Sequence, residues 1–256
     1  MIDTHCHLDA DEFSTDLSAV HAQARRCGVT HYIIPGVRAA GFARQKEILA
    51  RLPGTYAAYG IHPLFVAQTG GDDLPALRAM LQHEHPVAVG EIGLDFYLPQ
   101  ADHEQQMDFF VTQLQLAREF DLPVILHSRH AVEASLQTLQ RHRVRGGVAH
   151  AFNGSRQQAD AFIALGFKLG FGGALTHPGS RRIRALAAAL PLSAMVLETD
   201  APDIAPVWLQ GGRNSPAQLP RIAAELAQLR QMPTDALIAQ CDANARAVFP
   251  ALEKSV

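Results

Sequence analysis

The chain has 256 residues and a formal net charge of −3 at pH 7, with 48% hydrophobic and 18% charged residues. This composition excludes a mostly disordered chain and supplies enough apolar side chains for a sizeable core. The net charge does not by itself indicate a nucleic-acid partner, although it is compatible with a local patch of basic residues beside a site. The length fits a single (β/α)₈ barrel, which takes roughly 250 residues.

Cysteine usage and the N-terminal residues bear on the compartment. Cys6, Cys27 and Cys241 form neither a disulfide framework nor a Cys-x-x-Cys pair, which favours a reducing compartment. No apolar run is long enough to span a bilayer, and the first residues lack the basic and apolar regions of a signal peptide. We therefore expect a cytoplasmic protein without a membrane-spanning segment.

Short apolar runs, most of them rich in Val, Ile or Phe, recur along the whole chain. They lack strict alternation of apolar and polar residues, which is typical of strands buried on both faces. The predicted strands are 2–7, 32–37, 56–61, 87–93, 124–127, 147–151, 167–172 and 195–199.

Amphipathic stretches with helical spacing separate most of these runs. Ser155 and Ser215 suit the N-cap position, and Pro216 suits a first helical turn. No helix is predicted between the third and the fourth run. The predicted helices are 13–27, 41–52, 102–120, 131–141, 155–165, 180–190, 215–228 and 233–248.

Strands that alternate with helices predict an α/β fold with a parallel sheet. Eight strands in a chain of this length favour a closed (β/α)₈ TIM barrel, and an open doubly wound sheet is the alternative. No Pro/Ser-rich linker, charge block or low-complexity stretch divides the chain. We expect one domain over residues 1–256.

Histidines and carboxylates stand at the ends of several predicted strands. In a barrel, the carboxyl ends of all strands converge on one mouth. A lone buried His is more often a hydrogen-bonded core residue, and a lone Glu is more often half of an ion pair. The whole set, in contrast, predicts a metal site at the C-terminal mouth. Its members are His5, His7, Glu91, His127, His150 and Asp200.

The number of these candidate ligands bears on the number of ions. His5 and His7 are two residues apart and share a face of a strand, so both reach one ion while Cys6 points the opposite way. Six ligands exceed what one tetrahedral ion uses, whereas two ions about 3.5–4 Å apart and bridged by a carboxylate would use them all. Glu91 is the natural bridge. Imidazole-rich ligation suits Zn²⁺, Mn²⁺ or iron better than Mg²⁺, but the sequence does not fix the ion.

Six motifs contain these residues or lie beside them. They are Ile2-Asp3-Thr4-His5-Cys6-His7, Gly60-Ile61-His62-Pro63, Gly90-Glu91-Ile92-Gly93-Leu94-Asp95, Leu122-Pro123-Val124-Ile125-Leu126-His127-Ser128-Arg129, His150-Ala151-Phe152-Asn153-Gly154 and Glu198-Thr199-Asp200-Ala201-Pro202. Together they resemble the motifs of the TatD family of metal-dependent deoxyribonucleases, within the amidohydrolase superfamily. The resemblance runs from Met1 to Phe249.

The resemblance implies a (β/α)₈ barrel that hydrolyses phosphodiester bonds in DNA, often from a 3′ end. By position, His5, His7, Glu91 and Asp200 would hold one divalent ion, and Glu91, His127 and His150 would hold a second. A metal-activated water would attack the phosphorus. Asp200 would orient or deprotonate that water, and it forms with Glu91 the expected catalytic pair.

Substrate contacts are predicted at two further positions. His62 ends the third strand and would contact a phosphate, or it caps a loop. Arg129 would make a bidentate phosphate contact, or it pairs with Asp95. An aromatic side chain at the mouth would stack a base, the candidates being Phe96, Tyr97 and Trp208, and for Trp208 the favoured alternative is packing of its loop onto the barrel.

Three departures from the family pattern concern substrate choice and leave the ligand positions intact. They are His130, Leu64 and Asn214-Ser215-Pro216. The sequence pI of about 6.5 is also low for a protein that contacts many phosphates.

We expect a 3′–5′ exonuclease-like phosphodiesterase with DNA as substrate and no obligate protein partner. The alternative is a metal-dependent hydrolase of another ester or amide, such as an aminoacyl-RNA or a small ester. A non-catalytic metal-binding protein is the third hypothesis, and the presence of all six ligand types argues against it.

Overall fold

The computed structural model describes residues 1–253 and contains one eight-stranded sheet in the order β1 to β8. Every neighbouring pair of strands is parallel. The strands are β1 Ile2–Asp3, β2 His31–Pro35, β3 Thr55–Tyr59, β4 Ala88–Asp95, β5 Val124–Arg129, β6 Gly147–Ala149, β7 Phe167–Phe171 and β8 Met195–Leu197.

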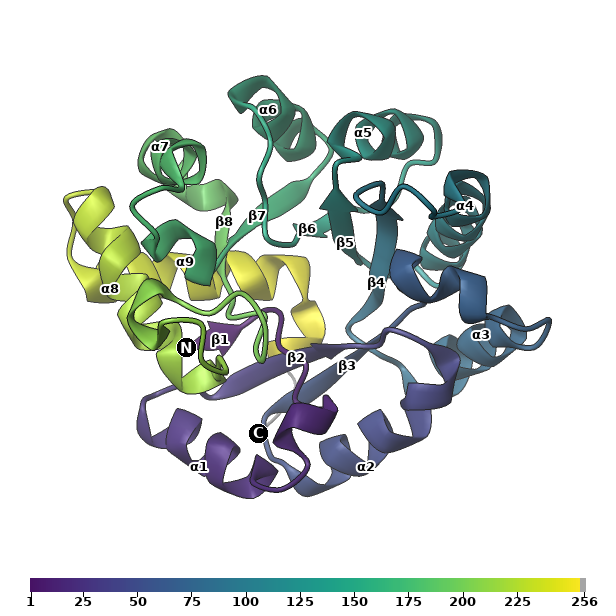
Figure 1. Cartoon of the computed structure of the whole chain (residues 1–256), viewed down its shortest axis with the longest axis horizontal. Coiled ribbons are helices and arrows are strands. Elements are labelled where there is room, and N and C mark those ends of the chain that lie inside the picture. Colours follow the sequence, from purple (N-terminus) through teal and green to yellow (C-terminus); the bar gives the residue numbers. More distant parts are fainter. Residues whose placement is uncertain (254–256) are drawn as a thin grey trace.

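Two backbone hydrogen bonds bring the first and last strands together. Thr4 N donates to Leu197 O at 3.1 Å, and Asp200 N donates to His5 O at 2.8 Å. The predicted TIM barrel is therefore confirmed, and the open doubly wound alternative is wrong. Figure 1 looks into the mouth, with the helices forming an outer ring around the sheet.

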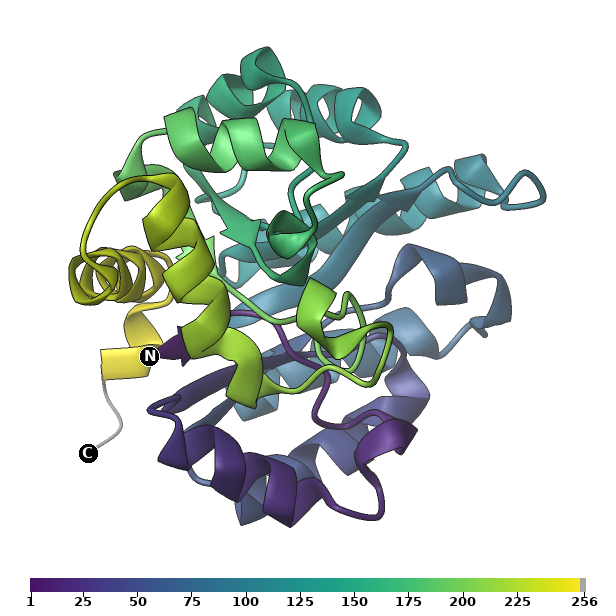
Figure 2. The same cartoon turned by 60° about the vertical axis from the view of Figure 1, so that its left-hand side comes forward.

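The helices follow the strands in regular alternation. They are α1 Leu17–Arg26, α2 Phe42–Arg51, α3 Asp73–Glu84, α4 His103–Glu119, α5 Val132–Arg141, α6 Arg156–Ala164, α7 Arg181–Ala189, α8 Leu219–Leu229 and α9 Thr234–Val248. None of the helices in the described part of the chain combines the length and apolar character needed to cross a bilayer. Figure 2 shows α8 and α9 on the same side of the molecule as the N-terminus.

Two apolar clusters hold these layers together. The larger one lies between the sheet and the helices and includes Cys6, so this side chain does point away from the neighbouring histidines. The smaller one fills the barrel below the mouth. It joins inward-facing apolar residues of the strands to Ala245 and Val248 at the end of α9 and to Phe249 just after it. The end of α9 therefore closes the end of the barrel that lies opposite the mouth.

Local predictions were less accurate than the overall fold. Helix α3 was missed, because it buries only Leu77 and Leu81 completely and therefore has a weak apolar stripe. Ser155 caps α6 in a capping box, as predicted. Ser215 is not an α-helix cap, since its side chain makes no capping bond and it precedes a 3-10 helix at Pro216–Gln218, with α8 starting only at Leu219.

The path of β4 places Glu91 in the centre of the barrel. The pairing between β4 and β5 changes register between Val89 and Ile92. A Cβ atom on Gly90 would lie 2.6 Å from Cβ of Ile125, a distance that only glycine avoids. This close approach of two backbones explains the glycine that precedes Glu91.

Candidate metal centre at the barrel mouth

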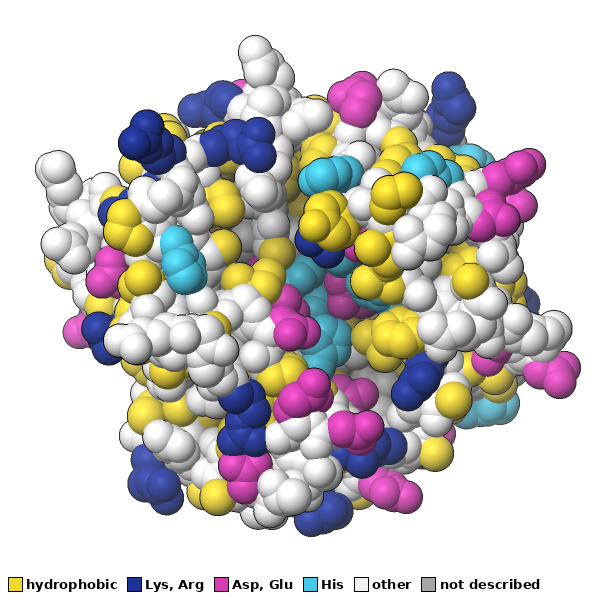
Figure 3. Space-filling model, in the orientation of Figure 1, with side chains coloured by type: hydrophobic (Ala, Val, Ile, Leu, Met, Phe, Trp, Pro, Cys, Tyr) yellow, Lys and Arg dark blue, Asp and Glu magenta, His cyan; other side chains and the backbone are white. Residues whose placement is uncertain are grey.

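Four of the predicted ligands meet at one point of the mouth. Nε2 of His5 lies 3.1 Å from Nε2 of His7, 3.2 Å from Oε2 of Glu91 and 3.4 Å from Oδ1 of Asp200. Nε2 of His7 lies 3.5 Å from the same Glu91 oxygen and 3.6 Å from the same Asp200 oxygen. In Figure 3 the histidines and carboxylates line the bottom of a hollow in the molecular surface.

These distances fit a single cation. Ligands about 2.0–2.2 Å from a tetrahedral Zn²⁺ stand about 3.3–3.6 Å from one another. Nε2 of His5 and Nε2 of His7 also face each other, and two imidazole lone pairs approach this closely only with a proton or a cation between them. The donor set of two imidazoles and two carboxylates therefore suits a divalent ion.

Glu91 also faces a second group of donors. Its Oε1 lies 2.9 Å from Nδ1 of His127 and 3.4 Å from Nε2 of His62. The other nitrogen of the His127 ring, Nε2, lies 3.0 Å from Oδ2 of Asp95. A carboxylate on the far nitrogen fixes the ring and its tautomer, which is the usual arrangement around a metal-ligating histidine. Glu91 thus directs one oxygen to each group.

The tautomer of His62 separates it from the ligands. Nδ1 of His62 accepts a hydrogen bond from the backbone N–H of Leu64 at 3.1 Å. A neutral ring that accepts at Nδ1 carries its proton on Nε2, and this nitrogen lies 3.4 Å from Oε1 of Glu91, within ion-pair distance but outside hydrogen-bond geometry. His62 therefore caps the 3-10 turn Pro63–Gln68, which is the predicted alternative, and its ring offers no free lone pair to an ion while this bond persists.

His150 occupies a different place from the one expected. Its ring stacks on His5 with the centroids 3.6 Å apart, and its Nε2 lies 3.7 Å from Oδ1 of Asp200. It is not among the nearest donors of the Glu91–His127 pair, where His62 lies instead. Of the six predicted ligands, the structure gathers all at one mouth, but it places His150 on the side of His5 and Asp200.

Sequence reasoning assigned no role to Glu198, which lies under His150. Oε1 of Glu198 is 3.1 Å from Nδ1 of His150, close enough for an ion pair although not in hydrogen-bond geometry, and it accepts the backbone N–H of Ala151 at 2.6 Å. A Cβ on Gly170 would lie 2.2 Å from this carboxylate. Glu198 is two residues before Asp200, the same period-two spacing that identified His5 and His7.

The protonation of the site follows from its charges. Burial opposes a charge on His7, but Glu91 and Asp200 outweigh it and raise the pKa of His7 to about 9. Glu198 and Asp200 likewise raise the pKa of His150 to about 10. Burial and the neighbouring His150 hold the pKa of His5 well below its usual value. In the metal-free centre, protons thus balance the carboxylates.

The other carboxyl groups of the centre differ from one another. Burial opposes the charge of Glu91, but the facing imidazoles hold its pKa well below the usual range. Burial raises the pKa of Asp200 to about 6. Asp200 also adopts a left-handed backbone conformation, with φ of 58°, which is uncommon for a residue other than glycine and often marks a functional position.

The side chains predicted to contact substrate lie in three different surroundings. His62 lies in the centre, as described. The guanidinium of Arg129 lies 3.6 Å from the ring centroid of Tyr97 and does not form the alternative ion pair with Asp95. Trp208 is packed on its loop, because its indole N–H donates to Gln218 at 2.9 Å.

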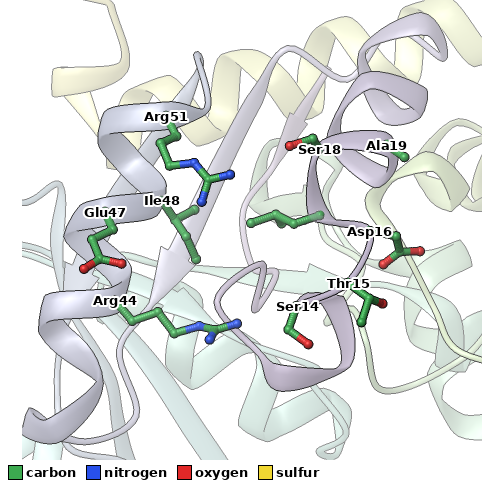
Figure 4. A pocket seen from close by; sticks show the side chains of 10 residues that line it. Ser14, Thr15, Asp16, Ser18, Ala19, Arg44, Glu47, Ile48 and Arg51 are labelled. Atoms are coloured by element: carbon green, nitrogen blue, oxygen red, sulfur yellow. The ribbon is translucent and has the colours of Figure 1, made fainter.

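A cavity of about 490 Å³ lies outside this centre, between α1 and α2. Figure 4 shows Arg44 extending towards Ser14 and Arg51 extending from α2 towards the side of Ser18. None of the predicted ligands lines it, so it is not part of the candidate metal centre.

Comparison with known proteins agrees with this geometry. Residues 2–250 match the family described as TatD related DNase. The metal-dependent hydrolase YjjV of Escherichia coli K12 is 42% identical over 91% of this chain and 92% of its own. The 3'-5' ssDNA/RNA exonuclease TatD of a Pantoea species is 34% identical over 97% of this chain and 99% of its own.

A solved structure gives the same result for the fold. The crystal structure of the TatD homologue YjjV from Escherichia coli K12 superposes with a TM-score of 0.94 at 40% identity, and the match covers 98% of each chain. The family match and these relatives span nearly the whole sequence, and the His, Glu and Asp groups at the mouth can hold metal. The chain therefore belongs to the TatD-related DNase family of metal-dependent hydrolases.

Proposed function

We propose that this protein is a phosphodiesterase that removes nucleotides from the 3′ end of a DNA strand with two divalent ions. The observation that carries the proposal is the position of Glu91. Its Oε2 faces His5 and His7, and its Oε1 faces His127, with all of these contacts between 2.9 and 3.5 Å. A carboxylate between two groups of imidazoles is the arrangement that a two-ion hydrolytic site needs.

The ligand sets follow from this arrangement. His5, His7, Glu91 and Asp200 would hold the first ion. Glu91, His127 and His150 would hold the second, as the family resemblance implies, although in this structure the ring of His150 lies on the side of His5 and Asp200 and His62 is the imidazole that lies beside Glu91 and His127. The imidazole-rich set favours Zn²⁺ or Mn²⁺ over Mg²⁺. When bound, the ions would lower the pKa of a water and offset the charge that develops on the phosphoryl oxygens.

The side chains of the mouth would supply the remaining chemistry. Asp200, whose Oδ1 faces His5 and His7 at the first ion position, would orient the attacking water and accept its proton. The Nε2–H of His62 and the guanidinium of Arg129 would donate to the phosphate. Asp95 would hold the ring of His127 through the 3.0 Å contact described above.

The experiment is hydrolysis of a labelled single-stranded oligonucleotide by metal-stripped protein, with Mg²⁺, Mn²⁺ or Zn²⁺ added back. Asp200→Asn is the control, because it removes the proposed base with little change in volume. Metal-dependent shortening from the 3′ end that disappears in the variant supports the proposal. If the folded, metal-loaded protein leaves the strand intact but hydrolyses aminoacyl or small esters, the proposal is wrong and the ester hydrolase takes its place.

A further inference from the structure

The exposed apolar residues of this protein are concentrated on one face. Among the described residues, every large hydrophobic side chain that is clearly exposed lies on a loop that follows a strand at the mouth. These side chains, which we call the apolar rim, are Leu64, Tyr97, Leu98, Ile204 and Val207, with exposed fractions between 37% and 48%. Single exposed apolar residues are ordinary, but a set confined to one face marks a binding surface.

The apolar rim has two sides. Leu64 follows β3, and Tyr97 and Leu98 follow the neighbouring β4, whereas Ile204 and Val207 follow β8. Because β4 and β8 stand far apart in the strand order, these sides lie on different parts of the mouth. Figure 3 shows hydrophobic surface on both sides of the hollow that contains the histidines.

The first side is connected directly to the metal centre. Oδ1 of Asp95 accepts the backbone N–H of Tyr97 at 3.0 Å, and Oδ2 of the same carboxylate contacts His127. The guanidinium of Arg129 in turn lies over the ring of Tyr97, 3.6 Å from its centroid. The carboxylate of Asp95 and the cation–π contact of Tyr97 therefore link a proposed ligand, an aromatic ring and a cation.

The second side is held equally firmly. The amide of Asn214 donates to Thr199 O and to Asp203 O, both at 2.8 Å. The backbone N–H of Val207 donates to Oγ1 of Thr176 at 2.9 Å. A Cβ on Gly173 would lie 2.0 Å from Ile204 O, so the loop packs against its neighbour without a gap. Ile204 and Val207 are thus exposed on a well-packed loop.

The charges around the mouth do not favour a long polyanion. The loop after β1 carries Asp9, Asp11, Glu12 and Asp16 and no Lys or Arg. The cations nearest to it are already paired, Arg44 with Asp11 at 3.5 Å and Arg213 with Asp16 at 2.6 Å. In Figure 3 the dark blue side chains form one group at the upper left and are otherwise scattered among magenta ones. A nucleic-acid strand that ran across this face would find few phosphate contacts.

We propose that the apolar rim binds the base of the nucleotide next to the scissile phosphate, and that the protein contacts no more than about two phosphates of the strand. This inference rests on the proposed phosphodiesterase function. Tyr97 and Arg129 form the main contact, because bases stack on aromatic rings and on guanidinium planes. The enzyme would therefore act on the ends of short strands as efficiently as on long ones.

The test compares a dinucleotide, a pentanucleotide and a long strand with the same terminal sequence, each across a series of salt concentrations. We expect kcat/KM to be independent of length and to fall with salt at a log–log slope no steeper than about −1.5, since each phosphate contact on a single strand contributes about −0.7. A kcat/KM that rises with length, together with a much steeper slope, would overturn the inference.

The base contact is tested with a strand whose terminal unit lacks the base. Tyr97→Ala should lower kcat/KM about 30-fold on the ordinary strand, the middle of the range for a lost stacking contact, and should have little effect on the abasic one. Tyr97→Phe is the matched control and should behave as wild type on both. Equal losses of Tyr97→Ala on both strands would show that the ring only holds Arg129. Failure of wild type on every phosphodiester would instead refute the proposed function itself.

Discussion

Asp3 and Thr199 join the first and the last strand of the barrel directly below the metal centre. Oδ2 of Asp3 accepts the hydroxyl of Thr199 at 2.6 Å, and Oδ1 accepts the backbone N–H of Thr199 at 3.0 Å and that of His5 at 3.3 Å. Thr199 precedes Asp200, so this one carboxyl group positions two of the four donors around the first ion. Burial raises the pKa of Asp3 to about 7.

Removal of the Asp3 carboxyl group should destabilise the barrel. Asp3→Ala leaves two buried N–H groups without an acceptor, and we expect a loss of about 2–4 kcal/mol in the free energy of unfolding. Asp3→Asn keeps one oxygen acceptor and resembles the protonated acid, so it should cost less. Urea unfolding of the metal-free variants at neutral pH measures both. Equal losses in the two variants would contradict the hydrogen-bond explanation.

His62 and His5 should respond differently to substitution. His5→Ala should lower the metal content of the purified protein, because Nε2 of His5 faces three other donors. His62→Ala should leave the metal content unchanged but lower kcat/KM, since its Nε2 carries a proton. His21→Ala is the matched control, because its ring contacts Pro53 O at 3.0 Å, away from the mouth. Elemental analysis that showed metal loss in His62→Ala would make His62 a ligand.

Glu198 should influence metal affinity through its contact with the ring of His150. Glu198→Gln keeps an acceptor for the N–H of Ala151 but removes the charge beside Nδ1 of His150, and we expect metal affinity to fall by about 10–100-fold. Asp203→Asn is the control, since it removes a carboxylate from the exposed part of the same loop. Competition with a chelator gives the affinities. Unchanged affinity in Glu198→Gln would leave the carboxylate with a purely structural role.

The barrel was predictable because each buried strand corresponds to a short apolar run in the sequence. The ends of the strands were not. β1 stops at Asp3 although the predicted run continues to residue 7, and beyond it the backbone N–H of His7 donates to Ala201 O on the loop after β8. Helix α3 escaped prediction because helices on the outside of a barrel need to bury only a narrow stripe.

The sequence predicted which residues meet in the candidate centre, but not how their side chains are oriented there. The strand-end rule found the six proposed ligands, since topology alone brings strand ends together. It could not show that His62 lies nearer to Glu91 than His150 does, because that depends on the rotation of rings. Asp3 and Glu198 were missed because a buried carboxylate at a strand end has no sequence signal that separates a ligand from a support.

Metal binding should become tighter as the pH rises. In the metal-free protein the pKa of His7 is about 9 and that of His150 about 10, both above the ordinary value of 6.5. Both rings are therefore protonated at neutral pH, and since a ligating imidazole must be neutral, the ions displace protons. The apparent affinity for Zn²⁺ or Mn²⁺ should rise with pH until the pH passes these values.

The same shifts set the stability of the metal-free form. A histidine whose pKa is raised on folding stabilises the fold fully below its unfolded value, and this contribution is lost as the pH rises through the folded value. The melting temperature of the metal-free protein should therefore fall between about pH 6.5 and pH 10. The melting temperature of the metal-loaded protein should fall less over this pH range, because the ions replace the protons among the same carboxylates. Differential scanning calorimetry of both forms over this window checks the sign, and a metal-free melting temperature that rose with pH would contradict the proton balance inferred for His7 and His150.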